Sequence, residues 1–126
     1  MRTATIAITG AEGFLGWHLS CRLAATRGVE PLRLGRADLA DLTSLRSGLA
    51  AVDTIIHVAG VNRAESDDDV ERGNVELADT LAAAIGDRPV HVVYANSIQS
   101  DLDNAYGRGK RRAAEVLRAL PGTFAD

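Results

Sequence analysis

Residues 9–16 read Thr9-Gly10-Ala11-Glu12-Gly13-Phe14-Leu15-Gly16, a glycine-rich turn that follows an apolar run over residues 3–8. Leu15, Leu19 and Leu23 then recur at the spacing of a helix. A strand, a glycine-rich turn and a helix in this order form the first crossover of doubly wound folds, where dinucleotides bind. The turn therefore predicts a dinucleotide site, and the alternative at this point is a tight turn without a ligand.

The three glycines of the G-x-x-G-x-x-G pattern have different physical roles. Gly10 can take backbone angles that are closed to other residues, so the chain can turn sharply there. Gly13 has no side chain to keep a pyrophosphate from the backbone, and Gly16 lets the helix lie close to the sheet. The start of the helix offers free N–H groups and the positive end of its dipole to a diphosphate.

Length and composition indicate one soluble globular domain over residues 1–126. Hydrophobic residues make up 46% and charged residues 25% of the chain, which is ordinary for a globular protein. The net charge of −3 disfavours nucleic acid as a partner, and the cluster Arg108, Lys110, Arg111 and Arg112 is interpreted as a solvated helix face. The lone Cys21 cannot form an internal disulfide and is expected to be buried or half-buried. No run is long enough for a membrane helix, and we expect a cytoplasmic protein with no membrane partner.

Strand and helix patterns alternate along the whole chain. Apolar runs predict strands at residues 3–9, 31–34, 54–58 and 90–95, and helical spacing predicts helices at 14–26, near 42–49, at 67–86 and at 105–120. Alternation of this kind implies right-handed crossovers and a parallel sheet. The predicted fold class is α/β, a truncated Rossmann-type doubly wound sheet of about four strands in the order 2-1-3-4. The acidic run at residues 67–69 suits the first turn of its helix and is not interpreted as a metal site.

Arg36 carries the prediction about the cofactor. In dinucleotide-binding folds an acid about 20 residues beyond the glycines holds the ribose 2′-hydroxyl of NAD, whereas an arginine accommodates the 2′-phosphate of NADP. Arg33 and Arg36 lie near the end of the second strand, and no acid precedes Asp38. We therefore expect NADP(H) to be preferred, with NAD(H) possible; a solvated loop role for Arg36 remains open at this point.

A tyrosine and a lysine four residues apart open the last helix. Tyr106 and Lys110 share one helix face, and a nearby ammonium favours ionisation of a phenol. Tyr106 is therefore a candidate proton donor or acceptor. Ser97 follows the fourth strand, on the ligand side of a parallel sheet, where its hydroxyl could hold a substrate carbonyl. A Y-x-x-x-K pair alone is common by chance, so the prediction depends on its order after the glycine turn and the serine.

Taken together, these segments resemble the extended short-chain dehydrogenase/reductase family, the NAD-dependent epimerase/dehydratase group. The resemblance rests on residues 9–16, His57-Val58-Ala59-Gly60, Asn74-Val75, Ser97, Tyr106 and Lys110. Within this family the chain is most similar to the N-terminal part of capsular-polysaccharide nucleotide-sugar reductases of CapF type. Residues 57–63, 73–75 and 96–99 carry this closer likeness.

The resemblance implies hydride transfer from NADPH to a keto group on a nucleotide-linked deoxy sugar, a precursor of cell-surface polysaccharide. Its implied catalytic residues are Tyr106 as proton donor, Lys110 on the nicotinamide ribose and Ser97 on the carbonyl. The implied cofactor contacts are Gly10, Gly13, Phe14, Leu15 and Gly16 at the pyrophosphate, Arg36 at the 2′-phosphate, Asp38 and Leu39 near adenine, and Ala59 and Gly60 beside the ribose. Asn62, Arg63 and Gln99 are the implied sugar contacts.

The chain departs from that family pattern in two ways. Family members continue with further strands and a substrate-binding portion, so we expect a fragment of a longer reductase, a short protein that needs a partner, or an NADP(H)-binding module without turnover; an epimerase or dehydratase is a further alternative. An unpaired edge on the fourth strand would favour a homo-oligomer. Gly107 and Gly109 each cost up to ~1 kcal/mol in a helix, so we expect a loose first turn there.

Overall fold

The sheet has five parallel strands in the order β2-β1-β3-β4-β5 in a computed structural model that describes residues 2–126. The strands are β1 (Ala4–Thr9), β2 (Val29–Leu34), β3 (Thr54–His57), β4 (His91–Tyr94) and β5 (Phe124–Ala125). The helices are α1 (Phe14–Ala24), α2 (Arg36–Leu39), α3 (Leu42–Gly48), α4 (Asp67–Ile85), the 3₁₀ helix η1 (Ile98–Asp101) and α5 (Ala105–Arg118). The predicted α/β class and the order of the first four strands are confirmed.

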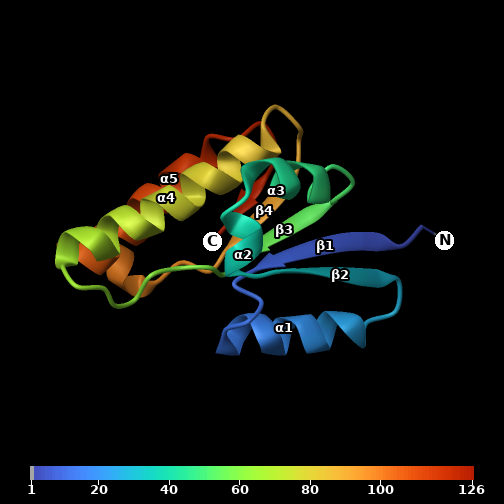
Figure 1. The fold of residues 1–126 in the computed structure, drawn as a ribbon, viewed down its shortest axis with the longest axis horizontal. Helices are drawn as coiled ribbons and strands as arrows, with labels where there is room; N and C mark the ends of the chain where they lie inside the picture. Colours follow the sequence, from blue (N-terminus) through green and yellow to red (C-terminus); the bar gives the residue numbers. More distant parts are fainter. Residues whose placement is uncertain (1) are drawn as a thin grey trace.

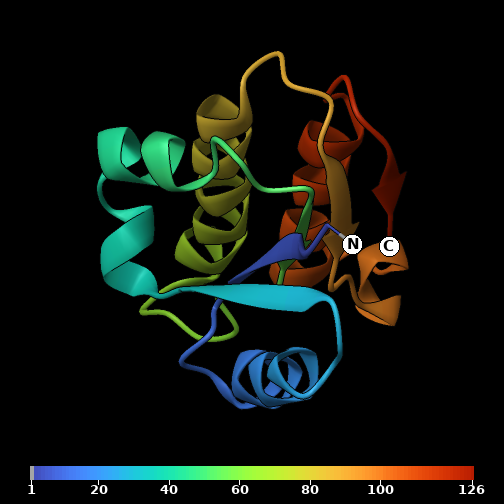
Figure 2. The same cartoon turned by 90° about the vertical axis from the view of Figure 1, so that its right-hand side faces the viewer.

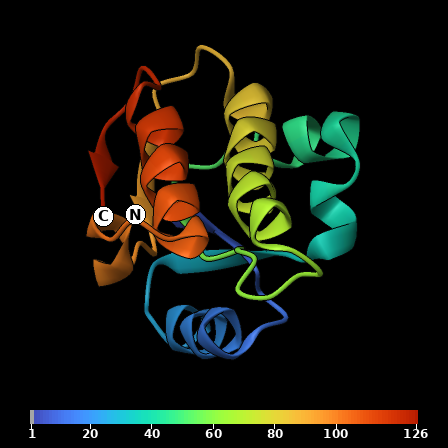
Figure 3. The same ribbon diagram turned by 90° about the vertical axis from the view of Figure 1, so that its left-hand side faces the viewer.

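Helices cover the two faces of the sheet unequally (Figures 1 and 2). α1 lies alone on one face, and α2, α3, α4 and α5 lie on the other, with α4 and α5 side by side (Figure 3). The core fills the space under the larger helical layer. Its largest fully buried apolar side chains are Leu45, Leu49, Ile55, Leu81, Val92 and Leu117. Aliphatic residues thus build the core, with Tyr94 as its one aromatic member among residues 2–126.

Two strands differ from their predicted extents. β2 begins at Val29, two residues before the predicted start, because Pro31 lies in an edge strand that pairs only with β1 and loses no second ladder. β5 was not predicted, since Phe124–Ala125 is too short to carry a periodic pattern. It pairs with Val92 and Val93, so the edge of β4 that we expected to be unpaired is occupied there.

Short helices and one exposed side chain also correct the sequence analysis. α2 and η1 were not predicted; α2 begins after Gly35, whose N–H donates to the carboxylate of Asp38 at 2.7 Å. Cys21 is exposed rather than buried, because the outer side of α1 faces away from the sheet. Among residues 2–126, no helix combines the length and the apolar character needed to cross a membrane.

The α4–α5 contact is tight where a loose turn was expected. A Cβ at Gly109 would lie 3.0 Å from the Cα of Glu71, and one at Gly107 would overlap the carbonyl oxygen of Gln99. Both glycines therefore permit close packing.

The basic cluster expected to be a solvated helix face makes ion pairs instead. Arg108 and Arg112 donate to Glu71 at 2.9 and 3.0 Å. These bonds hold the pKa of the Glu71 carboxyl below its usual value.

Candidate dinucleotide cleft

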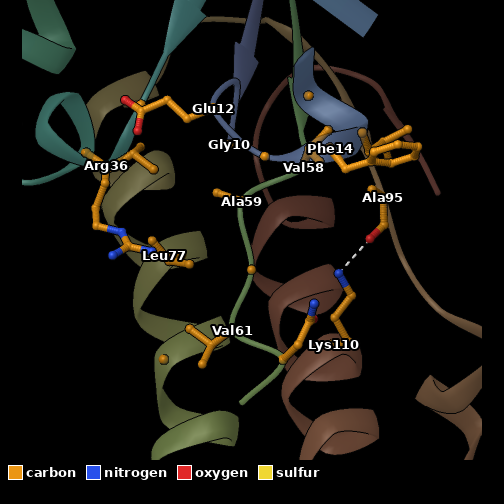
Figure 4. A pocket seen from close by; sticks show the side chains of 18 of the residues that line it. Gly10, Glu12, Phe14, Arg36, Val58, Ala59, Val61, Leu77, Ala95 and Lys110 are labelled. Atoms are coloured by element: carbon orange, nitrogen blue, oxygen red, sulfur yellow. Dashed lines mark hydrogen bonds between the residues drawn. The ribbon is translucent and has the colours of Figure 1, made fainter. Parts of the chain in front are cut away.

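A cleft of about 900 Å³ opens at the carboxyl ends of β1 and β3 (Figure 4). In doubly wound sheets this is the edge where ligands bind, at the point where the strand order reverses. Most of the site residues expected from the sequence line this cleft: Gly10, Gly13, Phe14, Leu15, Gly16, Arg36, Leu39, Ala59, Gly60, Asn62, Tyr106 and Lys110. Four do not, namely Asp38, Arg63, Ser97 and Gln99.

The glycine turn forms one wall of the cleft, and its geometry depends on the absence of side chains. Gly10 has a φ of +65°, and a Cβ there would lie 2.8 Å from the backbone nitrogen of Ala59. A Cβ at Gly16 would overlap the carbonyl oxygen of Gly10. At Gly13, by contrast, the nearest atom to an added Cβ is 3.4 Å away, so this position is open toward the cleft. Backbone can therefore approach a ligand closely at Gly13.

The N-terminus of α1 offers unpaired donors to the same wall. Gly13 is its N-cap residue, and within residues 2–126 no side chain caps the N–H groups of the first turn. Free N–H groups and the helix dipole favour an anion at such a position. The turn therefore fits a diphosphate on three grounds: the open space at Gly13, the close backbone approach and the uncapped helix start.

Two side chains of opposite charge, Arg36 and Glu12, lie at the end of the cleft that is remote from Lys110. Arg36 lies in the first turn of α2 and extends along the wall on the side of Leu77 (Figure 4). The carboxylate of Glu12 lies against Gly35, where an added Cβ would collide with its Oε1 atom. Asp38 is turned away, because its carboxylate accepts the Gly35 N–H that begins α2. An acid was expected at Asp38, but the acids that line the cleft are Glu12 and, on α4, Glu76.

The segment after β3 forms the opposite wall, and Asn74 of α4 holds it. The Asn74 amide accepts from the Val61 N–H at 3.0 Å and donates to the Val61 carbonyl at 2.8 Å. Its oxygen would lie 3.1 Å from a Cβ on Gly60. Asn74 is 2% exposed, so this clamp is shielded from water. The sequence resemblance included Asn74 but gave it no role; its position on the buried face of a predicted helix was the available signal.

Tyr106 and Lys110 close the cleft from α5. Asn104 caps this helix by accepting the Gly107 N–H at 2.7 Å, which starts the helix just before Tyr106. Lys110 is 4% exposed; its Nζ atom donates to the carbonyl of Ala95 at 2.5 Å (Figure 4) and lies 4.4 Å from the ring centroid of Tyr94. Burial lowers the pKa of Lys110 to about 8, so the ammonium persists at neutral pH but holds its proton less tightly.

The residues expected at the substrate lie less close together. The Ser97 hydroxyl accepts the Gln99 N–H at 3.1 Å and thereby begins η1. Gln99 and Arg63 are exposed outside the cleft, and only Asn62 of the three expected sugar contacts lines it. The arrangement thus brings together an anion cradle and a tyrosine–lysine pair, which suits a diphosphate-containing ligand and proton transfer at one of its neighbours.

Comparison with known proteins agrees with this geometry. A UDP-2-acetamido-2,6-beta-L-arabino-hexul-4-ose reductase of Pseudomonas aeruginosa is 38% identical over 117 residues, which cover 91% of this chain and 31% of that protein. The capsular polysaccharide assembling protein CapF of Staphylococcus aureus superposes with a TM-score of 0.69 at 28% identity, covering 95% of this chain and 32% of CapF. The chain therefore spans about a third of the length of these two proteins.

A more distant structure supports the fold alone. UDP-N-acetylglucosamine 4-epimerase of Bacillus cereus superposes with a TM-score of 0.76 at 22% identity, over 91% of this chain and 54% of the epimerase.

The model of the family described as NAD dependent epimerase/dehydratase matches residues 6–122. The resemblance seen in the sequence is thereby confirmed: this chain belongs to the NAD-dependent epimerase/dehydratase family.

Proposed function

We propose that this chain is the dinucleotide-binding part of a nucleotide-sugar reductase that prefers NADPH. The observation that carries the proposal is the cleft in which the glycine turn and the Tyr106–Lys110 pair face the same space. The similarity to a UDP-sugar hexulose reductase supports the substrate class, a keto sugar linked to a nucleotide. Because the chain spans 31% of that relative, most of the sugar pocket belongs to a portion that this sequence does not contain.

The chain's own residues have distinct roles in this reaction. When bound, NADPH supplies a hydride to the carbonyl carbon of the sugar. Tyr106 gives its phenolic proton to the carbonyl oxygen, so that the ketone becomes an alcohol. The Lys110 ammonium, which lines the same cleft, would hold the nicotinamide ribose by donating hydrogen bonds to its hydroxyls. Ser97 orients the carbonyl by donating its hydroxyl hydrogen, which stays available while the oxygen accepts the Gln99 N–H.

The preference for NADPH rests on Arg36. A guanidinium pairs well with a phosphate, and Arg36 lines the end of the cleft beyond the glycine turn. Glu12 is the specific observation that favours NADH as a second candidate, because a carboxylate accepts hydrogen bonds from ribose hydroxyls and repels a 2′-phosphate. The two side chains therefore act in opposite directions on the choice of cofactor.

Calorimetric titration with NADPH and with NADH tests the proposal. Gly13→Ala is the decisive variant, because an alanine there meets no atom closer than 3.4 Å in the fold yet occupies the space left for a pyrophosphate. We expect it to keep its melting temperature and to bind NADPH about tenfold or more weakly, which corresponds to about 1.4 kcal/mol. Gly48→Ala is the matched control, since nothing lies within 4 Å of its added Cβ.

Two further variants test the choice of cofactor. Arg36→Ala should weaken NADPH more than NADH, and Glu12→Gln should strengthen NADPH relative to NADH. Absence of binding of either cofactor to the wild-type chain would refute a working dinucleotide cleft. Equal binding by Gly13→Ala and Gly48→Ala would refute the glycine turn as its pyrophosphate site.

A further inference from the structure

Two buried polar residues beneath the cleft have no part in the reaction proposed above. Thr9 ends β1 and is 0% exposed; His57 ends β3 and is 1% exposed. They are partners in the strand register, and the Thr9 Oγ1 atom lies 2.7 Å from His57 Nδ1. Thr9 directly precedes Gly10, and His57 directly precedes the Val58-Ala59 segment. The pair therefore lies at the base of both cleft walls.

The other contacts of Thr9 fix the direction of this hydrogen bond. Its Oγ1 atom accepts the Val58 N–H at 3.0 Å and the Ala59 N–H at 3.1 Å. A hydroxyl oxygen has two acceptor lone pairs and one hydrogen to donate. Since both lone pairs are occupied, Thr9 must donate its hydrogen to His57 Nδ1. His57 is therefore neutral, with its proton on Nε2.

The surroundings of His57 keep the ring neutral and oriented. Burial, and secondarily the charge of Lys110, lowers the pKa of His57 to about 3, so it stays unprotonated near neutral pH. Its ring stacks on that of Tyr94, the next residue in the same register row, with centroids 5.5 Å apart and planes at 19°. The Nζ atom of Lys110 lies over the Tyr94 ring. One row of side chains thus extends from the glycine turn to the lysine of the cleft.

We propose that Thr9 and His57 are positioning residues of the dinucleotide site, an inference that rests on the function proposed above. His57 directs the Thr9 hydroxyl, and Thr9 holds the backbone of Val58 and Ala59 against the glycine turn. The loops after β1 and β3 diverge at the point where the strand order reverses, and the Thr9 hydroxyl bonds the second loop to the end of the first strand. Ala59 lies close to Gly10: a Cβ added at Gly10 would lie 2.8 Å from the backbone nitrogen of Ala59. A small displacement of Ala59 therefore changes the shape of the cleft.

Substitutions that remove one hydrogen-bonding group at a time test this role. Thr9→Val keeps the shape and loses the hydroxyl, whereas Thr9→Ser keeps the hydroxyl. His57→Phe keeps a ring on Tyr94 and loses the acceptor, whereas His57→Asn restores an acceptor at the δ position. Thr54→Val is the matched control, a half-buried threonine at the opposite end of β3.

The measured quantities are the dissociation constant for NADPH and the melting temperature. We expect Thr9→Val and His57→Phe to bind NADPH at least about tenfold more weakly, which corresponds to about 1.4 kcal/mol. The dissociation constants of the remaining variants should stay within about threefold of the wild type: Thr9→Ser, His57→Asn and Thr54→Val. Affinity of Thr9→Val equal to that of Thr54→Val would overturn the proposal. If Thr9→Val does not fold, the comparison of His57→Phe with His57→Asn decides in the same way.

Two spectroscopic measurements separate this inference from the proposed function. Nitrogen-15 NMR of the histidine rings should show His57 Nδ1 as a hydrogen-bonded acceptor and Nε2 as protonated; a protonated Nδ1 would overturn the inference. If the wild-type chain binds neither NADPH nor NADH, the proposed function fails, and amide hydrogen exchange still tests the positioning role. Faster exchange at Val58 and Ala59 in Thr9→Val than in Thr9→Ser supports it, and equal rates overturn it.

Discussion

Lys110 is the single lysine of the chain, and its burial makes stability depend on pH in a predictable direction. Burial lowers its pKa from 10.5 to about 8. Each pKa unit corresponds to about 1.4 kcal/mol, so the fold loses about 3 kcal/mol by keeping this ammonium below pH 8. Between pH 8 and 10.5 the unfolded chain holds a proton that the folded chain has released. Unfolding then takes up a proton, and the free energy of unfolding rises with pH.

The assay is urea unfolding at pH 7, 8, 9 and 10, followed by circular dichroism. We expect the free energy of unfolding to be flat from pH 7 to 8 and to rise by about 2–3 kcal/mol from pH 8 to 10. Above pH 10 the trend should weaken, because burial raises the pKa of Tyr94 and the unfolded chain then loses a proton that the folded chain keeps. Lys110→Met is the control, and its stability should not rise over this range.

NMR gives an independent measurement of the same group. Labelling with lysine that carries carbon-13 at Cε yields one lysine resonance, which should titrate near pH 8 in the folded chain. A resonance that titrates near 10.5, together with no rise in stability from pH 8 to 10, would refute the argument that burial controls the Lys110 ammonium.

Three further predictions concern packing, the α4–α5 contact and a helix cap. Gly107→Ala should lower the free energy of unfolding by about 1–3 kcal/mol, despite the better helix propensity of alanine, because its Cβ would overlap a backbone carbonyl of η1. Gly48→Ala lies in open space and should be neutral or stabilising by up to ~1 kcal/mol. The midpoints of urea unfolding compare the two variants. The low pKa of Glu71 stabilises the fold above its ordinary pKa, and this contribution is lost as the pH falls through the lowered value; Glu71→Gln should therefore lose less stability between pH 5 and 3 than the wild type or the exposed control Glu115→Gln. Ser66→Ala removes the side chain that accepts an N–H at the start of α4 and should cost about 1 kcal/mol in thermal unfolding, and no change would contradict the cap.

The sequence predicted the parts of the fold that carry a local periodic signal. The apolar runs of β1, β3 and β4 and the helical spacing of α4 and α5 lie within about two residues of their predicted ends. The shorter elements escaped prediction because their causes are not periodic. α2 depends on one carboxylate, Asp38, turned back to the Gly35 N–H, and β5 depends on two residues that find a partner in β4.

The residues of the candidate site likewise fall into those that a local sequence pattern predicted and those that it did not. The glycine turn and the Tyr106–Lys110 spacing are local patterns, so they could be recognised, and the structure brings these residues to one cleft. Contacts between residues far apart in the chain left no such pattern: Thr9 meets His57 across 48 positions, and Glu12 reaches the residue before α2. Gly107 and Gly109 were read from helix propensity alone, and only the neighbouring backbone shows why they are small.

The interior place of β1 in the sheet, between β2 and β3, has a consequence for how the chain folds. β1 pairs with β2 on one side and with β3 on the other, so Ile6 of the first strand adjoins Thr54. At translation rates of roughly 5–20 residues per second, β3 emerges about 2–10 seconds after β1. During this time the apolar Ala7 and Ile8 lack their second neighbour. Non-local parallel pairing of this kind slows folding, and it leaves the apolar face of β1 exposed until β3 has been synthesised.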